Sequence, residues 1–121
     1  MHRSTIAIEI FNCIVDSKDG TLDVMGYALP DNGYFVGGEG APLVFESAEE
    51  ANRPEAMRKI SAFVDRTRAR FIGWWTDSET GKVYVDGTTW FAVRSEAMRT
   101  SRERQEIAFW DIAGQSEIRT S

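Results

Sequence analysis

The segment at residues 71–93, FIGWWTDSETGKVYVDGTTWFAV, constrains the fold more than any other part of the chain. Two runs rich in β-branched and aromatic residues, which favour strands, flank a polar turn at residues 77–82. Gly81 stands in that turn, where glycine tolerates a positive φ. The segment holds three of the four tryptophans, Trp74, Trp75 and Trp90. The pattern therefore predicts a β-hairpin within the core, and it does not indicate an activity.

Further strands are expected around this hairpin. Alternating isoleucines predict a half-buried strand at residues 5–15, and clusters of glycine, proline and aspartate separate it from the segments that follow. The remaining strands are expected at residues 21–29, 34–37, 43–46, 106–112 and 117–120.

Two helices are expected between these strands. Ser47 and Glu50 form a capping box that begins the main helix, with Pro54 in its first turn, where a missing N–H costs nothing. Ser95 is expected to cap a second, shorter helix that ends near Arg104.

These elements predict a single α+β domain over residues 1–121, with a mostly antiparallel sheet and two helices packed on one face. Residues 34–75 and residues 83–111 both follow the order strand, turn, strand, capped helix, aromatic strand. That echo has two interpretations, shared β-β-α-β chemistry without duplication or duplicated β-β-α-β units.

The composition fits one soluble globular domain, because 42% of the 121 residues are apolar and 27% are charged. Cys13 is the only cysteine, so an intrachain disulfide is excluded and a reducing cytoplasm is the expected location. Cys13 is expected to be a buried, inert thiol. The apolar runs are too short to predict a transmembrane helix, and residues 1–15 do not resemble a signal peptide.

The charge is distributed unevenly along the chain. Residues 1–52 carry nine acidic and two basic side chains, whereas residues 53–121 carry ten acidic and twelve basic ones. A nucleic-acid interface formed by arginines of the predicted helices is therefore one alternative, and its residues would be Arg58, Arg66, Arg70, Arg99 and Arg102. A pI near 4.9 and the acidic residues interleaved with these arginines disfavour it.

No catalytic residue, metal ligand or cofactor site is predicted. His2 is the only histidine, which disfavours histidine-dependent triads and excludes a Cys/His metal cluster. Three aspartates, Asp77, Asp86 and Asp111, are expected to end strands and to hydrogen-bond turns. A small enzyme or nucleotide binder, using aspartates and arginines around the glycines of residues 37–40, is a further alternative.

Aromatic residues carry the preferred functional hypothesis. Adjacent Trp74 and Trp75 must point to opposite faces of a strand, so one enters the core and the other is either exposed or covered by another element. The candidate binding surface consists of Trp74, Trp75, Trp110 and Tyr84. We expect a non-catalytic protein-interaction module that binds a protein partner or itself, with a homodimer burying Trp75 or Trp110.

The runs GWWTDSETGKVYVD and AFWDIAGQSEIRT resemble small uncharacterised proteins of actinobacteria and their phages. The shared features are a Gly-x-Trp-Thr-Asp hairpin and a closing Trp-Asp-Ile/Leu followed by Gly and Glu-Ile. The resemblance covers about the last fifty residues and implies no activity, so no functional residue is carried over from it.

Overall fold

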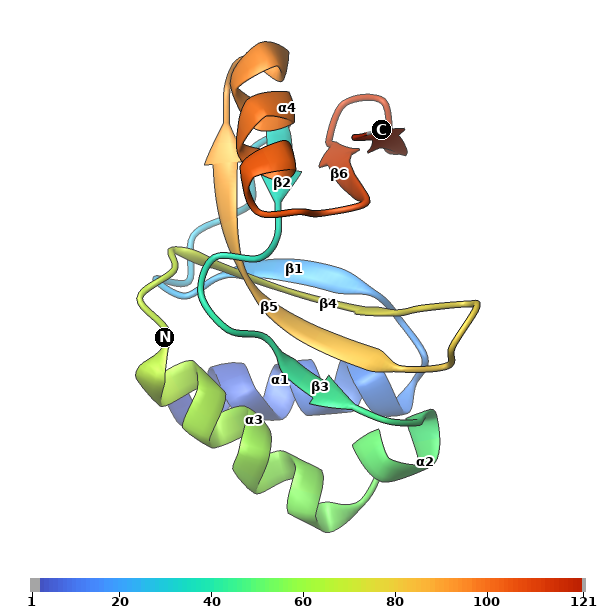
Figure 1. Ribbon diagram of the computed structural model, residues 1–121. Coiled ribbons are helices and arrows are strands. Elements are labelled where there is room, and N and C mark those ends of the chain that lie inside the picture. The colour runs from blue at the N-terminus through green and yellow to red at the C-terminus, as the bar shows by residue number, and fades with distance from the viewer. Residues whose placement is uncertain (1–2, 121) are drawn as a thin grey trace.

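The computed structural model describes residues 3–120, which form four helices and seven strands with antiparallel pairing (Figure 1). In chain order the elements are α1 (Arg3–Val15), β1 (Gly20–Asp23), β2 (Tyr34–Val36), β3 (Leu43–Phe45), α2 (Ala48–Ala51), α3 (Pro54–Arg66), β4 (Phe71–Thr76), β5 (Val83–Phe91), α4 (Arg94–Glu103), β6 (Ala108–Asp111) and β7 (Ser116–Arg119). The α+β class and the antiparallel sheet predicted from the sequence are confirmed. Within residues 3–120, no helix combines the length and the apolar character needed to cross a bilayer.

The predicted hairpin is present as β4 and β5, with Phe71 opposite Thr88 at its open end. Its turn closes through a hydrogen bond of 2.8 Å from the Gly81 N–H to the Asp77 carbonyl oxygen. Gly81 has a φ of +77°, as the turn pattern requires.

Strand β5 links the two parts of the sheet. Its first residues pair with β4 on one edge and with β3 on the other, and its last residues pair with β2, beyond which lie β6 and β7. Because β2 and β3 share one edge of β5, residues 37–42 loop out opposite residues 86–88. The Glu39 N–H donates to the Gly87 carbonyl oxygen at 3.0 Å and holds this loop to the strand. Figure 1 shows the β2–β6 part standing at a steep angle to the β1–β4 part.

The N-terminal segment is helix α1, so the strand expected at residues 5–15 is wrong. Ile6, Ile10 and Ile14 are spaced by four residues and are buried on one side of the helix, whereas Ile8 is 50% exposed. The isoleucines therefore satisfy a helical period as well as an alternating one, and packing against α3 selects the helix. The expected strand at 21–29 is also shorter, since β1 ends at Asp23, whose carboxylate accepts the Met25 N–H at 2.8 Å.

The predicted main helix is divided in two. Ser47 caps α2 as expected, with its hydroxyl oxygen accepting the Glu50 N–H at 3.1 Å. Arg53 is extended, with φ −74° and ψ 151°, and Pro54 begins α3. A residue before proline is disfavoured in the helical region, which explains the break.

Helix α4 begins at Arg94 with Val93 as its N-cap, and no side chain caps it. The prediction that Ser95 caps this helix is therefore wrong. The second expected β-β-α-β unit has a single continuous strand, β5, where two strands were expected, because Asp86 and Gly87 pair within the sheet with Gly73 and Ile72.

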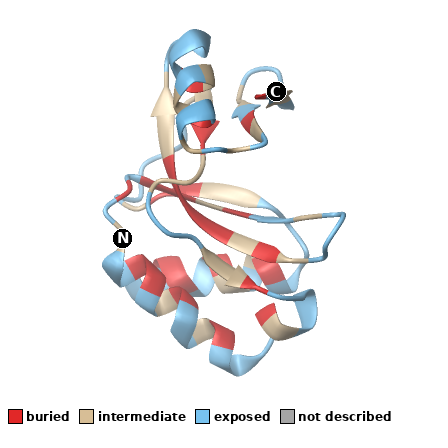
Figure 2. Cartoon of the chain, in the orientation of Figure 1, coloured by how far each residue is buried: buried red, intermediate tan, exposed pale blue. Residues whose placement is uncertain are grey.

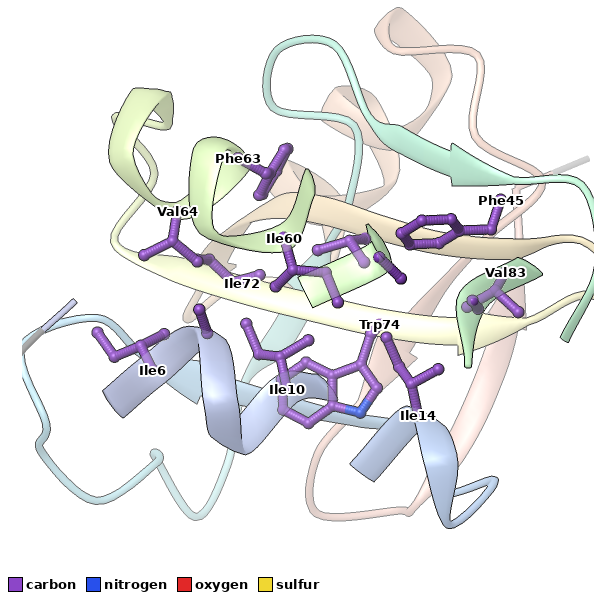
Figure 3. Packing of buried hydrophobic residues seen from close by; sticks show 14 of the residues in the cluster. Ile6, Ile10, Ile14, Phe45, Ile60, Phe63, Val64, Ile72, Trp74 and Val83 are labelled. Atoms are coloured by element: carbon purple, nitrogen blue, oxygen red, sulfur yellow. The ribbon is translucent and has the colours of Figure 1, made fainter. Parts of the chain in front are cut away.

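Helices α1 and α3 pack together and cover one face of the β1-β4-β5-β3 part, while α4 packs on β2, β5 and β6. The larger core lies under the first part and contains fully buried Ile10, Ile60 and Val64 with Trp74 at 5% exposure (Figure 3). Ile60 and Val64 have the helical spacing of four residues, and both are buried in the same cluster as Trp74. Buried residues line the inner sides of these helices and exposed residues their outer sides (Figure 2). Each fully buried aliphatic side chain contributes about 1.5–3 kcal/mol.

Candidate functional site

The four residues of the candidate binding surface do not share one face. Trp74 is 5% exposed and points toward α1, and its indole N–H donates to the Lys18 carbonyl oxygen at 2.9 Å (Figure 3). Its assignment to a binding surface is therefore wrong. Adjacent residues of a strand alternate between faces, so the burial of Trp74 places Trp75 on the opposite face.

Trp75 and Tyr84 form an aromatic pair on the sheet face turned away from α1 and α3. They are direct cross-strand partners in β4 and β5. Their rings are stacked with centroids 4.7 Å apart and an interplanar angle of 13°. Trp75 is 39% exposed and Tyr84 is half-buried. The hairpin therefore presents a stacked aromatic pair that is partly exposed to solvent.

Trp110 lies on the same side of the sheet, at its other end. It is opposite Phe35 in the β2–β6 register, and Phe35 is opposite Trp90 in the β2–β5 register. Directly opposed residues lie on the same face of a sheet, so Trp110, Phe35 and Trp90 share a face. Trp90 and Tyr84 lie an even number of positions apart in β5, so Tyr84 belongs to that face as well. Trp110 is 41% exposed. We call this side of the sheet, with Trp75, Tyr84, Asp86 and Trp110, the open face.

Asp86 lies beneath the aromatic pair. It belongs to the same alternating set of β5 as Tyr84, it is 7% exposed, and its Oδ2 accepts the Trp75 indole N–H at 3.4 Å. Burial raises the pKa of this carboxyl, and the indole hydrogen bond lowers it to a lesser extent. Asp86 was expected to end a strand, but it lies in the middle of β5, because that strand continues through Gly87. The other two aspartates do bond turns, as predicted: Asp77 accepts the Glu79 N–H and Asp111 the Gly114 N–H, both at 3.1 Å.

Glu106 brings a second carboxylate to Asp86, from the segment before β6. A Cβ placed on Gly37 would lie 3.0 Å from Glu106 Oε1 and 3.4 Å from Asp86 Oδ2, so both oxygens border the space above this glycine. Burial raises the pKa of Glu106, the Asp86 carboxylate raises it further, and Arg104 lowers it. The pair therefore combines a buried carboxyl, Asp86, with a half-buried one, Glu106.

Arg104 fixes the loop over which these carboxylates meet. Its guanidinium donates to the carbonyl oxygens of Val36 at 3.2 Å and Gly37 at 3.1 Å, and to the Thr89 hydroxyl at 2.9 Å. The Thr89 hydroxyl in turn donates to the Glu39 carboxylate. Three of the arginine's donors are thus used to hold the main chain and Thr89 rather than to pair with Glu106 or Asp86.

Two further acids stand at the rim of the open face. Asp19 accepts the Thr76 N–H at 3.2 Å, next to Trp75, and Glu117 is opposite Trp110 in the β6–β7 register. Burial raises the pKa of Asp19, the Thr76 hydrogen bond lowers it, and the charge of Glu117 raises it. Glu117 is therefore placed on the open face by its register, and Asp19 by its hydrogen bond next to Trp75.

The arginines of the nucleic-acid alternative are spread over separate elements. Arg58 and Arg66 lie on α3, and Arg99 and Arg102 lie on α4, which contacts the other part of the sheet. Arg70 is paired with Asp23 through two hydrogen bonds of 2.8 Å, and that partner holds the pKa of the Asp23 carboxyl below its usual range. Within residues 3–120, the five arginines are therefore divided between α3, the residue before β4 and α4 rather than gathered on one element.

Metal-ligand groups, surface hollows and Cys13 do not provide a second candidate site within residues 3–120. Among residues 3–120, no three His, Cys, Asp or Glu side chains are grouped to hold a metal ion. Two shallow hollows of about 290 and 220 Å³ are present, one between Phe45 and α3 and one between β1 and residues 26–29, and neither is lined by Trp75, Tyr84, Asp86 or Trp110. Cys13 is half-buried, and burial raises the pKa of its thiol, which disfavours a reactive thiolate.

The sequence analysis identified Trp75, Tyr84 and Trp110, and one of its alternatives expected aspartates and arginines around the glycines of residues 37–40, where Asp86 and Arg104 lie. It did not single out Asp86 for that site, and it missed Glu106. The alternation of β5 carries a signal for Asp86, since Tyr84 and Asp86 must share a face if the strand is continuous. Glu106 offered no comparable signal, because its position depends on how the segment after α4 returns to β2. Comparison of the chain with known protein families, with characterised proteins and with solved structures finds no match.

Proposed function

We propose that this chain is a non-catalytic protein-interaction module and that its open face is the binding surface. The observation that supports this most is the stacked pair of Trp75 and Tyr84, which remains accessible although Trp75 is a large aromatic residue. Exposed aromatic residues on a rigid sheet are typical anchors of protein interfaces, because they provide contact area at a low entropic cost.

Trp110 extends the same surface, since it is 41% exposed and lies on the same side of the sheet. The covered side of the sheet is occupied by α1, α3 and α4. The homodimer expected from the sequence remains a prediction. It would be one form of the proposed interaction, with a second copy of the chain as the partner.

An enzymatic role would rest on Asp86 and Glu106, because a pair of carboxyls with raised pKa values is a feature of acid catalysts. A catalytic acid must act on a bound substrate, however, and neither of the two hollows described above is lined by Asp86 or Glu106. The position of this carboxyl pair beside the aromatic residues therefore supports a role in binding over one in proton transfer.

The experiment compares three immobilised proteins, the wild type, Trp75→Ser and Val93→Ser, in a lysate of the organism that encodes the chain. Val93 is the matched control, since it is an apolar residue 49% exposed at the start of α4. Each retained protein is then purified and titrated by calorimetry. We expect a saturable interaction that Trp75→Ser weakens at least about tenfold, an effect of a size common for interface anchors, and that Val93→Ser leaves unchanged. Equal affinities of the wild type and Trp75→Ser for every retained protein would contradict the proposal.

A further inference from the structure

The open face carries negative charge that the described residues leave without an ion pair. The four ion pairs of residues 3–120 join other residues, and no lysine or arginine in this range lies within ion-pair distance of Asp86 or Glu106. Arg104, the nearest guanidinium named above, is bonded to main-chain oxygens and to Thr89. Burying nine-tenths of a carboxylate without a paired cation costs free energy. A cation supplied by a binding partner would therefore gain more interaction free energy here than at an exposed acid.

The surrounding charges are also mainly acidic. Asp19 and Glu117 stand at the rim, while Arg119 is placed on this side by its pairing with Ala108. At the far end, Asp23 is neutralised by its pair with Arg70. The balance on the open face is therefore negative, and it is complementary to a basic ligand.

We infer that the open face binds a basic segment of a partner protein, with an arginine or lysine side chain lying against Trp75 and reaching toward Asp86 and Glu106. This inference rests on the proposed function. Tyr84 stacks on one side of the Trp75 ring, and Trp75 is still 39% exposed, so a cation can approach the indole, which is the best aromatic partner for one. A planar guanidinium can stack on this ring and also donate to a carboxylate, so arginine should be preferred to lysine.

A basic partner fits the charges better than a second copy of the same face or a nucleic acid. A two-fold contact through this face would place each subunit's acids against a surface with the same acids, which is unfavourable. Phosphate groups would be repelled for the same reason.

The test uses the indole N–H resonances of the four tryptophans in ¹⁵N-labelled wild-type protein, each assigned by replacement with phenylalanine. The probe is an acetylated and amidated peptide in which arginine alternates with glycine, and matched peptides carry lysine, serine or glutamate instead. We expect saturable shifts of Trp75 and Trp110. Trp74 serves as the internal control, because it is buried on the opposite face of the sheet and its N–H donates to the Lys18 carbonyl oxygen.

The expected order of affinity is arginine, then lysine, with the serine and glutamate peptides at least about tenfold weaker, and the affinity for the arginine peptide should fall as salt is raised. Asp86→Asn and Glu106→Gln should each lower the affinity for the arginine peptide about fivefold, which corresponds to roughly 1 kcal/mol of binding free energy. Asp77→Asn is the control, since this carboxylate bonds only groups of the hairpin turn.

Equal binding of the serine and arginine peptides, or unchanged affinity in both carboxylate variants, would overturn the preference for a basic segment. These results are distinct from failure of the proposed function, which is measured by Trp75→Ser with the natural partner. Equal shifts of all four indoles would indicate non-specific association and would also contradict the inference.

Discussion

The indole of Trp75 lies parallel to the ring of Tyr84, with 4.7 Å between the two centroids and 13° between the planes. Because the two residues are direct cross-strand partners, the hairpin itself determines this geometry. Asp86 accepts the Trp75 indole N–H from the same strand as Tyr84. The aromatic surface and the acid beneath it are therefore preorganised, so little side-chain entropy remains to be lost when a partner binds.

The helix caps give a direct test of the local structure. Ser47→Ala should lower the free energy of unfolding by about 1 kcal/mol, because the serine hydroxyl accepts the Glu50 N–H at the start of α2. Ser95→Ala should have almost no effect, since Val93 rather than Ser95 is the N-cap of α4. Urea denaturation of both variants measures the difference, and a larger loss for Ser95→Ala would mean that the start of α4 is wrongly placed.

Ile60 tests the packing of α3 on the sheet. Ile60→Ala should cost about 2–5 kcal/mol through lost burial and a residual cavity, because this side chain is fully buried. The control is Ile8→Ala at a half-exposed position of α1, for which a change within about 0.5 kcal/mol is expected. Similar losses for the two variants in denaturant unfolding would contradict the core described above.

The carboxyls of the open face should make stability depend on pH. Burial raises the pKa of Asp86 and of Glu106, so the folded protein retains protons that the unfolded chain releases. Their contribution to stability therefore falls as the pH rises from the unfolded-state pKa, about 4, through the raised folded-state pKa. Asp86→Asn should raise the free energy of unfolding at pH 7 and flatten its pH dependence above pH 4. Urea unfolding between pH 3 and pH 8 measures both, and a less stable variant at pH 7 would refute this.

Asp23 should make stability depend on pH in the opposite direction. The Arg70 hydrogen bonds lower the pKa of the Asp23 carboxyl, so its stabilisation is present above the unfolded-state pKa and is lost as the pH falls through the folded-state pKa. Asp23→Asn should therefore destabilise the protein at pH 7 and approach the wild type in acid. A destabilisation that persists unchanged at the lowest pH would show that the carboxylate charge is not its cause.

Self-association through the open face should be recognisable by its dependence on salt. The acids of the face would oppose one another across a symmetric contact, so any such dimer should become more stable as salt screens them. Light scattering at micromolar concentration, at low and at high salt, measures this, and Trp75→Ser should abolish the dimer. A dimer that weakens with salt or survives Trp75→Ser would place self-association on another surface.

The sequence predicts the hairpin and much of the core because these depend on local signals. The turn at Gly81 and the β-rich runs around it specify β4 and β5, and the spacing of Ile60 and Val64 specifies the buried side of α3. The sequence fails at α1, where Ile6, Ile8 and Ile10 fit both a strand and a helix. Only packing against α3 and the sheet decides between these two periods.

The candidate site is less predictable than the fold, since it depends on contacts between distant segments. Which of Trp74 and Trp75 is exposed depends on the face that α1 and α3 cover, and this is a tertiary property. The proximity of Asp86 and Glu106 depends on the loop of residues 37–42 and on the Arg104 hydrogen bonds that hold it. These contacts join segments that are far apart in the sequence, and local sequence patterns do not specify such contacts.

Radical footprinting of the wild-type chain, with and without its purified partner, distinguishes binding at the open face from binding elsewhere. Trp75 and Trp110 are 39% and 41% exposed, so both are accessible to oxidation in the free protein. We expect the partner to protect these two residues and to leave the oxidation of Met25, 57% exposed, and Ile107, 66% exposed, unchanged. Protection of Met25 or Ile107 with unchanged oxidation of Trp75 and Trp110 would contradict binding at the open face.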